Sequence, residues 1–144
     1  MKVDKQTYVN QTKVSNIKRL IKLKRIVIYD ETFLIECRLK NAKQIAQDII
    51  DLMKQQSFYF EIYCVVTDRL RTYKYNRVYS DNNTTLNIIE SYYNATKDLP
   101  NLLVFHYGIR FSKQSDKNIL ELFNISGENQ NIPKPNGIIW PDSK

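Results

Sequence analysis

The sequence predicts a single α+β domain with a mixed sheet of five or six strands, flanked by three or four helices. Stretches with apolar residues at every second position, typical of strands, alternate with stretches that have apolar residues at helical spacing. The length of 144 residues corresponds to about one domain, and 42% hydrophobic and 26% charged residues are ordinary for a globular protein. This composition excludes multidomain, collagen-like and fully disordered chains.

We expect three regions: a flexible basic arm over residues 1–12, the α+β domain over 13–126, and an extended tail over 127–144. The arm has no apolar periodicity, and the tail holds two of the three glycines and three of the four prolines. No apolar run approaches the roughly 18 residues of a membrane-spanning helix, and the polar start does not resemble a signal peptide. The expected location is cytoplasmic, with no membrane partner.

The first predicted element is a short basic helix. It is expected to begin at Ser15, because Ile17, Leu20 and Ile21 follow at helical spacing. Burial of these three residues against the domain would turn the charged side of the helix outward.

A strand hairpin follows this helix. Residues 26–29 form a short apolar strand, Asp30 and Glu31 are a candidate turn, and residues 33–40 alternate between apolar and polar side chains. The alternation predicts a second strand with one buried face.

A helix and a long strand come next. Asn41 is the expected N-cap of a helix that reaches about Gln55, with Gln44 at the capping-box position. The strand over 58–67 is apolar or aromatic on both faces, which indicates an interior position in the sheet. Because it follows the strand over 33–40 and a helix, a right-handed parallel crossover is the expected connection.

The second half of the domain repeats the alternation of strand and helix. Residues 69–79 form an extended run, and residues 84–99 have apolar side chains at helical spacing. Residues 102–111 return to a period of two, which predicts another strand, and Ser115 can cap a last short helix.

The positive charge is concentrated at one end of the chain. The net charge is +7, and residues 1–44 hold eleven basic and four acidic side chains, so the remaining 100 residues are neutral. Clustered Lys and Arg are typical of surfaces that bind phosphates, because a polyanion releases counterions when it meets them. The candidate phosphate contacts in the basic helix and just after it are Lys18, Arg19, Lys22, Lys24 and Arg25.

The extended run over 69–79 combines basic and aromatic side chains on one side of a regular strand. Tyrosine rings can stack on unpaired bases and guanidinium groups can bind phosphates, which is the chemistry of single-strand binding surfaces. The candidate residues are Arg69, Arg71, Tyr73, Tyr75 and Arg77. With the basic helix, this run predicts a non-enzymatic accessory protein that binds DNA or RNA, without a cofactor.

A second hypothesis comes from three residues of the hairpin. Asp30, followed by Glu36 and Arg38 ahead of a helix and an apolar strand, resembles the core of the restriction-endonuclease-like nucleases. The resemblance implies that Asp30 and Glu36 bind magnesium, and that Arg38 stands where that family has a lysine assisting the attacking water. It covers about residues 15–67 and implies a magnesium-dependent nuclease.

A third hypothesis is a protein that binds or inhibits another protein through its basic surface. Trp140 is the only tryptophan and lies in a polar tail. It is expected either to fold back on its own domain or to dock on a protein partner or a second copy of the chain.

The remaining candidate chemistry is limited. His106 is the only histidine, so a multi-histidine metal site is excluded, and a plain hydrogen-bonded or exposed histidine is expected rather than a catalytic one. Cys37 and Cys64 fall on apolar strand faces and are expected to be buried free thiols. Three glycines cannot form a phosphate-binding loop of the ATPase or dinucleotide type.

Overall fold

The computed structural model describes residues 5–68, 73–77, 81–100, 103–111, 119–123 and 138–139, with no side chains described for 5–9, 73–77 and 138–139. These residues form a single α+β domain, as the sequence predicts. Its elements, in chain order, are α1 (Lys5–Lys22), β1 (Ile26–Tyr29), β2 (Thr32–Glu36), α2 (Ala42–Gln55), β3 (Phe60–Thr67), β4 (Tyr73–Arg77), α3 (Asn82–Thr96), β5 (Val104–Phe111), the 3-10 helix η1 (Ile119–Phe123) and β6 (Ile138–Ile139).

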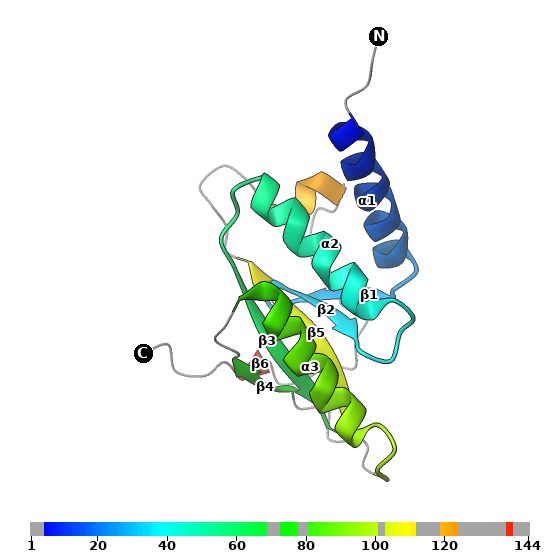
Figure 1. Ribbon diagram of the computed structural model, residues 1–144. Coiled ribbons are helices and arrows are strands. Elements are labelled where there is room, and N and C mark those ends of the chain that lie inside the picture. Colours follow the sequence, from blue (N-terminus) through cyan, green and yellow to red (C-terminus); the bar gives the residue numbers. More distant parts are fainter. Residues whose placement is uncertain are drawn as a thin grey trace.

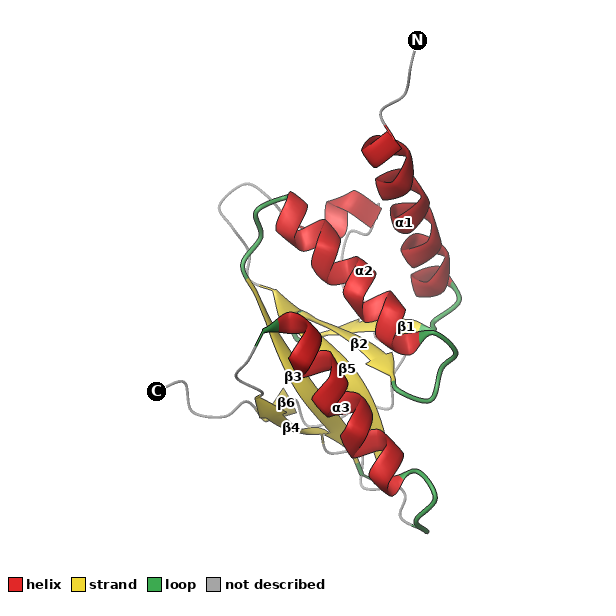
Figure 2. Cartoon of the chain, viewed as in Figure 1, coloured by secondary structure: helices red, strands yellow, loops and turns green. Residues whose placement is uncertain are grey.

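The strands form one sheet in the order β1-β2-β5-β3-β4-β6. Neighbouring strands are antiparallel, except that the short β6 runs parallel to β4. The three α-helices lie together on one side of the sheet (Figures 1 and 2). Among the described residues, no helix combines the length and apolar character needed to cross a bilayer.

The first helix is longer than the sequence predicts. It begins at Lys5, so the predicted start at Ser15 is wrong and residues 5–12 of the predicted arm are helical. Its docking residue Ile17 is completely buried, and Lys13 forms a 3.2 Å ion pair with Asp51 of α2. Because adding residues to an existing helix is far easier than starting one, this docked half allows the helix to extend into a segment without apolar periodicity.

The hairpin of β1 and β2 is present, with Asp30 and Glu31 as its two-residue turn. Both residues are left-handed, with φ of 52° and 54°, which is the twist that such a turn requires. β2 ends at Glu36 instead of continuing to residue 40, because the chain turns there: the amide of Leu39 donates to the Glu36 carbonyl at 3.1 Å.

α2 has the predicted bounds, with Asn41 at the N-cap position and Gln55 at the end, but its capping interaction differs from the prediction. Asn41 has φ 61° and its side chain makes no capping hydrogen bond, so the predicted capping box is wrong. An N-cap side chain reaches the first turn from an extended backbone, which Asn41 does not have. Gln44 instead donates to Asp48 one turn along the same helix, at 2.9 Å. The apolar stripe of the helix is buried as predicted.

The predicted parallel connection through a helix joins strands that are not neighbours in the sheet. β2 and β3 are parallel to each other, but β5 lies between them and pairs antiparallel with both. β4 and β5 are likewise joined through α3 and separated by β3. The two eight-residue strands, β3 and β5, occupy the centre, where their apolar side chains are covered.

The second half of the domain is partly outside the described residues. Of the predicted run over 69–79, residues 73–77 are described and form β4. Asp81 caps α3, where its carboxylate accepts from the amide of Thr84 at 3.0 Å. The last predicted helix is a 3-10 helix over its described residues, 119–123.

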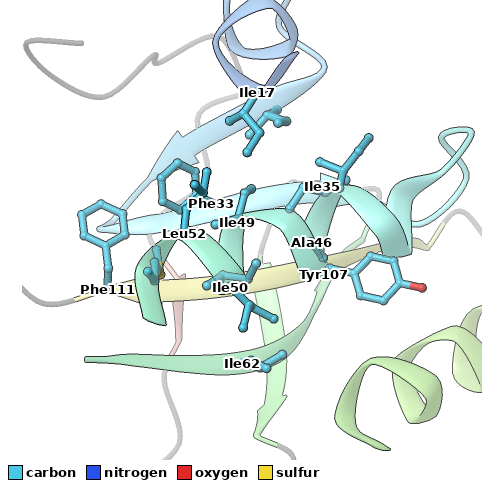
Figure 3. Packing of buried hydrophobic residues seen from close by; sticks show 14 of the residues in the cluster. Ile17, Phe33, Ile35, Ala46, Ile49, Ile50, Leu52, Ile62, Tyr107 and Phe111 are labelled. Atoms are coloured by element: carbon cyan, nitrogen blue, oxygen red, sulfur yellow. The ribbon is translucent and has the colours of Figure 1, made fainter. Parts of the chain in front are cut away.

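The main core lies between the helices and one face of the sheet (Figure 3). Ile17 of α1 and Ile49 of α2 are buried against this face. Phe33 anchors it, with its ring 5.2 Å from that of Phe111 and 6.0 Å from that of Phe123 in an edge contact. Each such side chain contributes about 1.5–3 kcal/mol through burial, so this face holds most of the apolar stabilisation.

The other face of the sheet carries a smaller apolar cluster of Leu34, Tyr63 and Val65. Gly108 belongs to this face, where a Cβ atom would lie 2.5 Å from Val65 Cγ2 and 3.3 Å from the Tyr63 carbonyl oxygen. A glycine at this position therefore lets the central strands and their side chains pack closely. This second face leads, at one end of the sheet, to the candidate site.

Candidate functional site

The candidate site begins on the solvent side of α1. Lys18, Arg19 and Lys22 are exposed, whereas Ile17 and Ile21 are buried. At about 100° per residue, the three cations fall within roughly a 100° arc that faces away from the buried pair. Docking of the two isoleucines therefore orients the basic side of the helix toward solvent.

The helix ends in a turn that adds two more exposed cations, Lys24 and Arg25. The Lys24 amide donates to the Ile21 carbonyl at 3.0 Å, and the Arg25 amide donates to the Leu20 carbonyl at 2.8 Å. These two bonds and the left-handed φ of 62° at Lys24 define a Schellman motif, in which glycine is the usual residue. Lysine holds this conformation at a cost of about 1–2 kcal/mol.

The five cations form what we call the basic surface: Lys18, Arg19, Lys22, Lys24 and Arg25. No ion pair joins any of them to a carboxylate within the described residues. Among the described residues, the Arg19 side chain donates only to the amide oxygen of Asn16, at 3.0 Å. The charge of this surface is thus available to an anionic partner.

Next to the basic surface, one end of the sheet contains a cavity of about 270 Å³, which we call the end cavity. It lies where β2 and β3 end and where β1 and β5 begin. Its polar lining comes from Lys24, Arg25, Glu36, Arg38, Thr67 and His106. The end cavity therefore joins two cations of the basic surface to residues from three strands or their ends.

Glu36 and Arg38 form an ion pair at the mouth of the end cavity. Nε of Arg38 donates to the Glu36 carboxylate at 2.7 Å, and the Arg38 side chain remains 67% exposed. The Glu36 carboxylate accepts a hydrogen bond from the Nε–H of the Arg38 guanidinium. The two Nη groups of this guanidinium remain as donors for another anion. The pair therefore orients Arg38 without using all of its hydrogen-bonding capacity.

His106 lies in the wall of the end cavity and is only 6% exposed. It is paired with Glu36 in the β2–β5 ladder, and its Nδ1 donates to the Val65 carbonyl at 3.3 Å, since a carbonyl oxygen can only accept. Burial lowers the pKa of His106, an effect that the Glu36 carboxylate and the carbonyls of Val65 and Val104 partly oppose. The imidazole is therefore neutral near pH 7, and the plain hydrogen-bonded histidine expected from the sequence is confirmed.

Thr67, at the end of β3, supplies an unusual polar atom. Within the part of the chain that the structure describes, its Oγ1 is buried and has no hydrogen-bond partner. Leaving a buried hydroxyl without a partner costs about 1–3 kcal/mol, so such groups are rare in folded proteins. Thr67 lines the end cavity, but its Oγ1 has almost no accessible surface, so a guest there can supply the missing bond once the side chain rotates toward the cavity.

The residues of the nuclease hypothesis are not brought together. Asp30 is in the turn of the hairpin, whereas Glu36 is at the opposite end of β2. Four residues at roughly 3.3 Å each separate these ends by about 13 Å, which is too far for two carboxylates to bind one magnesium ion. Within the described residues, no group of three or more His, Cys, Asp or Glu side chains is arranged to hold a metal.

The residues of the Arg/Tyr run are only partly described. Arg69 and Arg71 lie outside the described residues, as does Trp140 of the tail. For Tyr73, Tyr75 and Arg77 the structure gives the backbone pairing alone, opposite Thr67, Val65 and Tyr63 respectively. The first rung of β4 is thus beside Thr67, at the end of the sheet that holds the end cavity.

A second cavity, of about 330 Å³, lies between α2 and α3. Its lysine, Lys43, is bound to Glu90 at 3.1 Å and to Asn87 at 3.0 Å. The charge of this cavity is therefore already compensated, unlike that of the end cavity.

Both cysteines are free and buried, as the sequence predicts. Burial raises the pKa of Cys64 to about 12 and also raises the pKa of Cys37. Thiols with raised pKa values are poor nucleophiles at neutral pH, so neither cysteine has the character of a catalytic residue.

The sequence assigns Lys24 and Arg25 to the phosphate-binding hypothesis and Glu36 and Arg38 to the nuclease hypothesis. It connects none of the four with Thr67 or His106. The connection depends on β5 lying between β2 and β3, which places His106 beside Glu36. Strand alternation shows which face a residue occupies, but not which strand is its neighbour. Comparisons with protein families, curated proteins and solved structures found no match to this chain.

Proposed function

We propose that this protein is a non-enzymatic nucleic-acid-binding protein that contacts phosphates with its basic surface. The observation that carries the proposal is that Lys18, Arg19, Lys22, Lys24 and Arg25 are all exposed and none is compensated by a carboxylate among the described residues. Five neighbouring uncompensated cations repel one another, and a polyanion relieves that repulsion while releasing its own counterions.

The position of the basic surface supports nucleic acid over an acidic protein as the partner. The basic surface continues into the end cavity, where Arg38 adds a further cation and Thr67 a buried hydroxyl without a partner. Arginine and hydroxyl donors at hydrogen-bonding range are the groups that position phosphates.

The backbone register of β4 supports a longer contact. Tyr73 is paired with Thr67, so the Arg/Tyr strand begins next to the end cavity. A single-stranded nucleic acid that crosses the basic surface and reaches the end cavity is then close to β4, whose tyrosines are our candidates for base stacking. Stacking on such rings contributes about 1–3 kcal/mol per base.

The proposal is tested by fluorescence anisotropy with labelled single- and double-stranded DNA and RNA, using the full chain. Lys18→Glu/Lys22→Glu is expected to weaken binding at least tenfold at low salt, since two phosphate contacts become repulsive. The matched control is Lys54→Glu/Lys97→Glu, which changes the net charge equally at exposed residues of α2 and after α3, outside the basic surface. The control should bind like the unmodified protein.

Equal loss in both double variants would show that only net charge matters and would reject the basic surface. Failure of the unmodified protein to bind any of the four nucleic acids at low salt would overturn the function itself. A partner retained from extract after nuclease digestion, together with that failure, would point to an acidic protein instead.

A further inference from the structure

We propose that the end cavity binds a phosphate monoester, such as the phosphorylated end of a nucleic-acid strand. The proposal extends the nucleic-acid function and rests on it for the strand that carries the phosphate. It concerns a different set of contacts, because the end cavity is distinct from the exposed helix face of Lys18, Arg19 and Lys22.

The charge of the end cavity matches a dianion. Lys24, Arg25 and Arg38 bring three positive charges, Glu36 brings one negative charge, and His106 is neutral near pH 7. The net charge of the lining is therefore about two positive. A phosphate monoester carries about −1.5 to −2 at pH 7, whereas a phosphodiester within a strand carries one negative charge.

The donors of the end cavity suit phosphate oxygens. Arg38 is oriented by its 2.7 Å bond to Glu36, and its Nη groups are the kind of paired donor that binds phosphate through two oxygens. The buried Thr67 hydroxyl lacks a partner among the described residues, and rotation of its side chain toward the cavity would let a phosphate oxygen accept its hydrogen. One guest would thus satisfy the buried hydroxyl and neutralise the excess charge together.

The size of the end cavity limits the guest. About 270 Å³ is slightly below the range of roughly 300–1,000 Å³ that holds drug-sized ligands. A phosphate with the sugar that carries it is small enough, whereas a stretch of several nucleotides is not. The end of the nucleic-acid strand would therefore enter the end cavity, and the rest of that strand would lie on the basic surface.

The first test uses inorganic phosphate and deoxyadenosine 5′-monophosphate as probes. His106 is the only histidine in the sequence, so its ring resonances can be followed by NMR in the full chain without assignment of other histidines. Both probes are expected to shift these resonances saturably, while chloride at the same ionic strength does not. Unchanged resonances with both probes would overturn the phosphate site, whatever the protein does with long nucleic acids.

The second test compares one short single strand with a 5′-phosphate, with a 3′-phosphate and with hydroxyl ends. At least one phosphorylated form is expected to bind about tenfold more tightly than the hydroxyl-ended strand. Thr67→Val removes the hydroxyl at nearly constant volume and should reduce this preference to less than threefold. Arg38→Gln, at an exposed side chain, should do the same without any effect on packing.

The matched control is Thr96→Val, at a threonine of α3 whose hydroxyl donates to the Tyr92 carbonyl at 2.9 Å. This variant should retain the tenfold preference. Equal binding of all three strands would reject the end cavity as a phosphate site and leave the nucleic-acid function standing. Loss of hydroxyl-ended binding in Lys18→Glu/Lys22→Glu, with the NMR response to phosphate retained, would show that the two sites act separately, as proposed.

Discussion

His106 combines burial with a position beside a charged cavity. Its ring donates to the Val65 carbonyl, and Glu36 on β2 and the cations Lys24, Arg25 and Arg38 of the end cavity are the charged groups around it. Burial outweighs the Glu36 carboxylate, so the pKa of His106 in the folded protein lies below 6.5, its ordinary value. Protonation of this residue is therefore linked to unfolding.

The expected result is a loss of stability in mild acid. When the pH falls below 6.5, the unfolded chain takes up a proton at residue 106 that the folded protein resists, so the free energy of unfolding decreases. From about pH 7.5 to about pH 5.5, where Asp and Glu with ordinary pKa values stay ionised, the urea midpoint should fall. In His106→Asn the same change of pH should leave the midpoint nearly constant; an equal fall in both proteins would contradict the account.

Single residues show where sequence reasoning is strong and where it fails. The buried state of Cys37 and Cys64 follows from alternation alone, because their neighbours on the same strand face are apolar. The buried state of His106 does not, because its face is apolar only once β2 and β3 have paired on either side of β5. A local sequence pattern does not predict the environment of a residue when that environment depends on pairing with strands that lie far away in the sequence.

At the scale of elements, the end of α1 has a conformation that its sequence does not favour. Lys24 occupies the left-handed position of a Schellman motif, where glycine is the usual residue, and it also lines the end cavity. Strained residues often cluster at functional sites, so we interpret the strain at Lys24 as the cost of placing a positive charge at this position.

Lys24→Gly should therefore stabilise the fold and weaken nucleic-acid binding. Glycine relieves the left-handed strain of the folded protein but adds conformational freedom to the unfolded chain. The net increase in the free energy of unfolding, measured with urea, should be about 0.5–1 kcal/mol. Loss of one phosphate contact should lower affinity several-fold in anisotropy. The control Lys24→Gln removes the charge but keeps the Cβ atom, so it should lose the same affinity without gaining stability. A stabilised Lys24→Gly that binds at full strength would remove Lys24 from the site.

The elements themselves were predictable to different degrees. Apolar periodicity predicts β1, β2, β3 and β5 and the two helices α2 and α3, because burial of one face dominates their stability, whereas β6 lies in the predicted tail. It misses the first ten residues of α1, which are held by the docked half of the same helix, and the αL start of α2 at Asn41. Both errors fall at helix starts, where local signals are weak relative to tertiary packing.

At the scale of the whole molecule, the fold separates stability from binding. The three α-helices lie on one face of the sheet (Figure 2), where they cover the main core. The end cavity opens at one end of the other face, beside the end of α1. The basic N-terminal part of the sequence thus reaches the ends of strands that lie far along the chain. Charge asymmetry predicted the basic surface, but the sheet order was needed to show that Glu36, Arg38 and His106 meet beside it.

The most direct test of phosphate binding by the basic surface is the salt dependence of affinity for a single strand. For each phosphate contact, the slope of log K against log salt concentration changes by about 0.7. Lys18→Gln/Lys22→Gln should therefore flatten the slope by about 1.4, while Lys54→Gln/Lys97→Gln should keep the slope of the unmodified protein. Identical slopes in all three proteins would contradict the account, because the cations of α1 would then make no contact with phosphate.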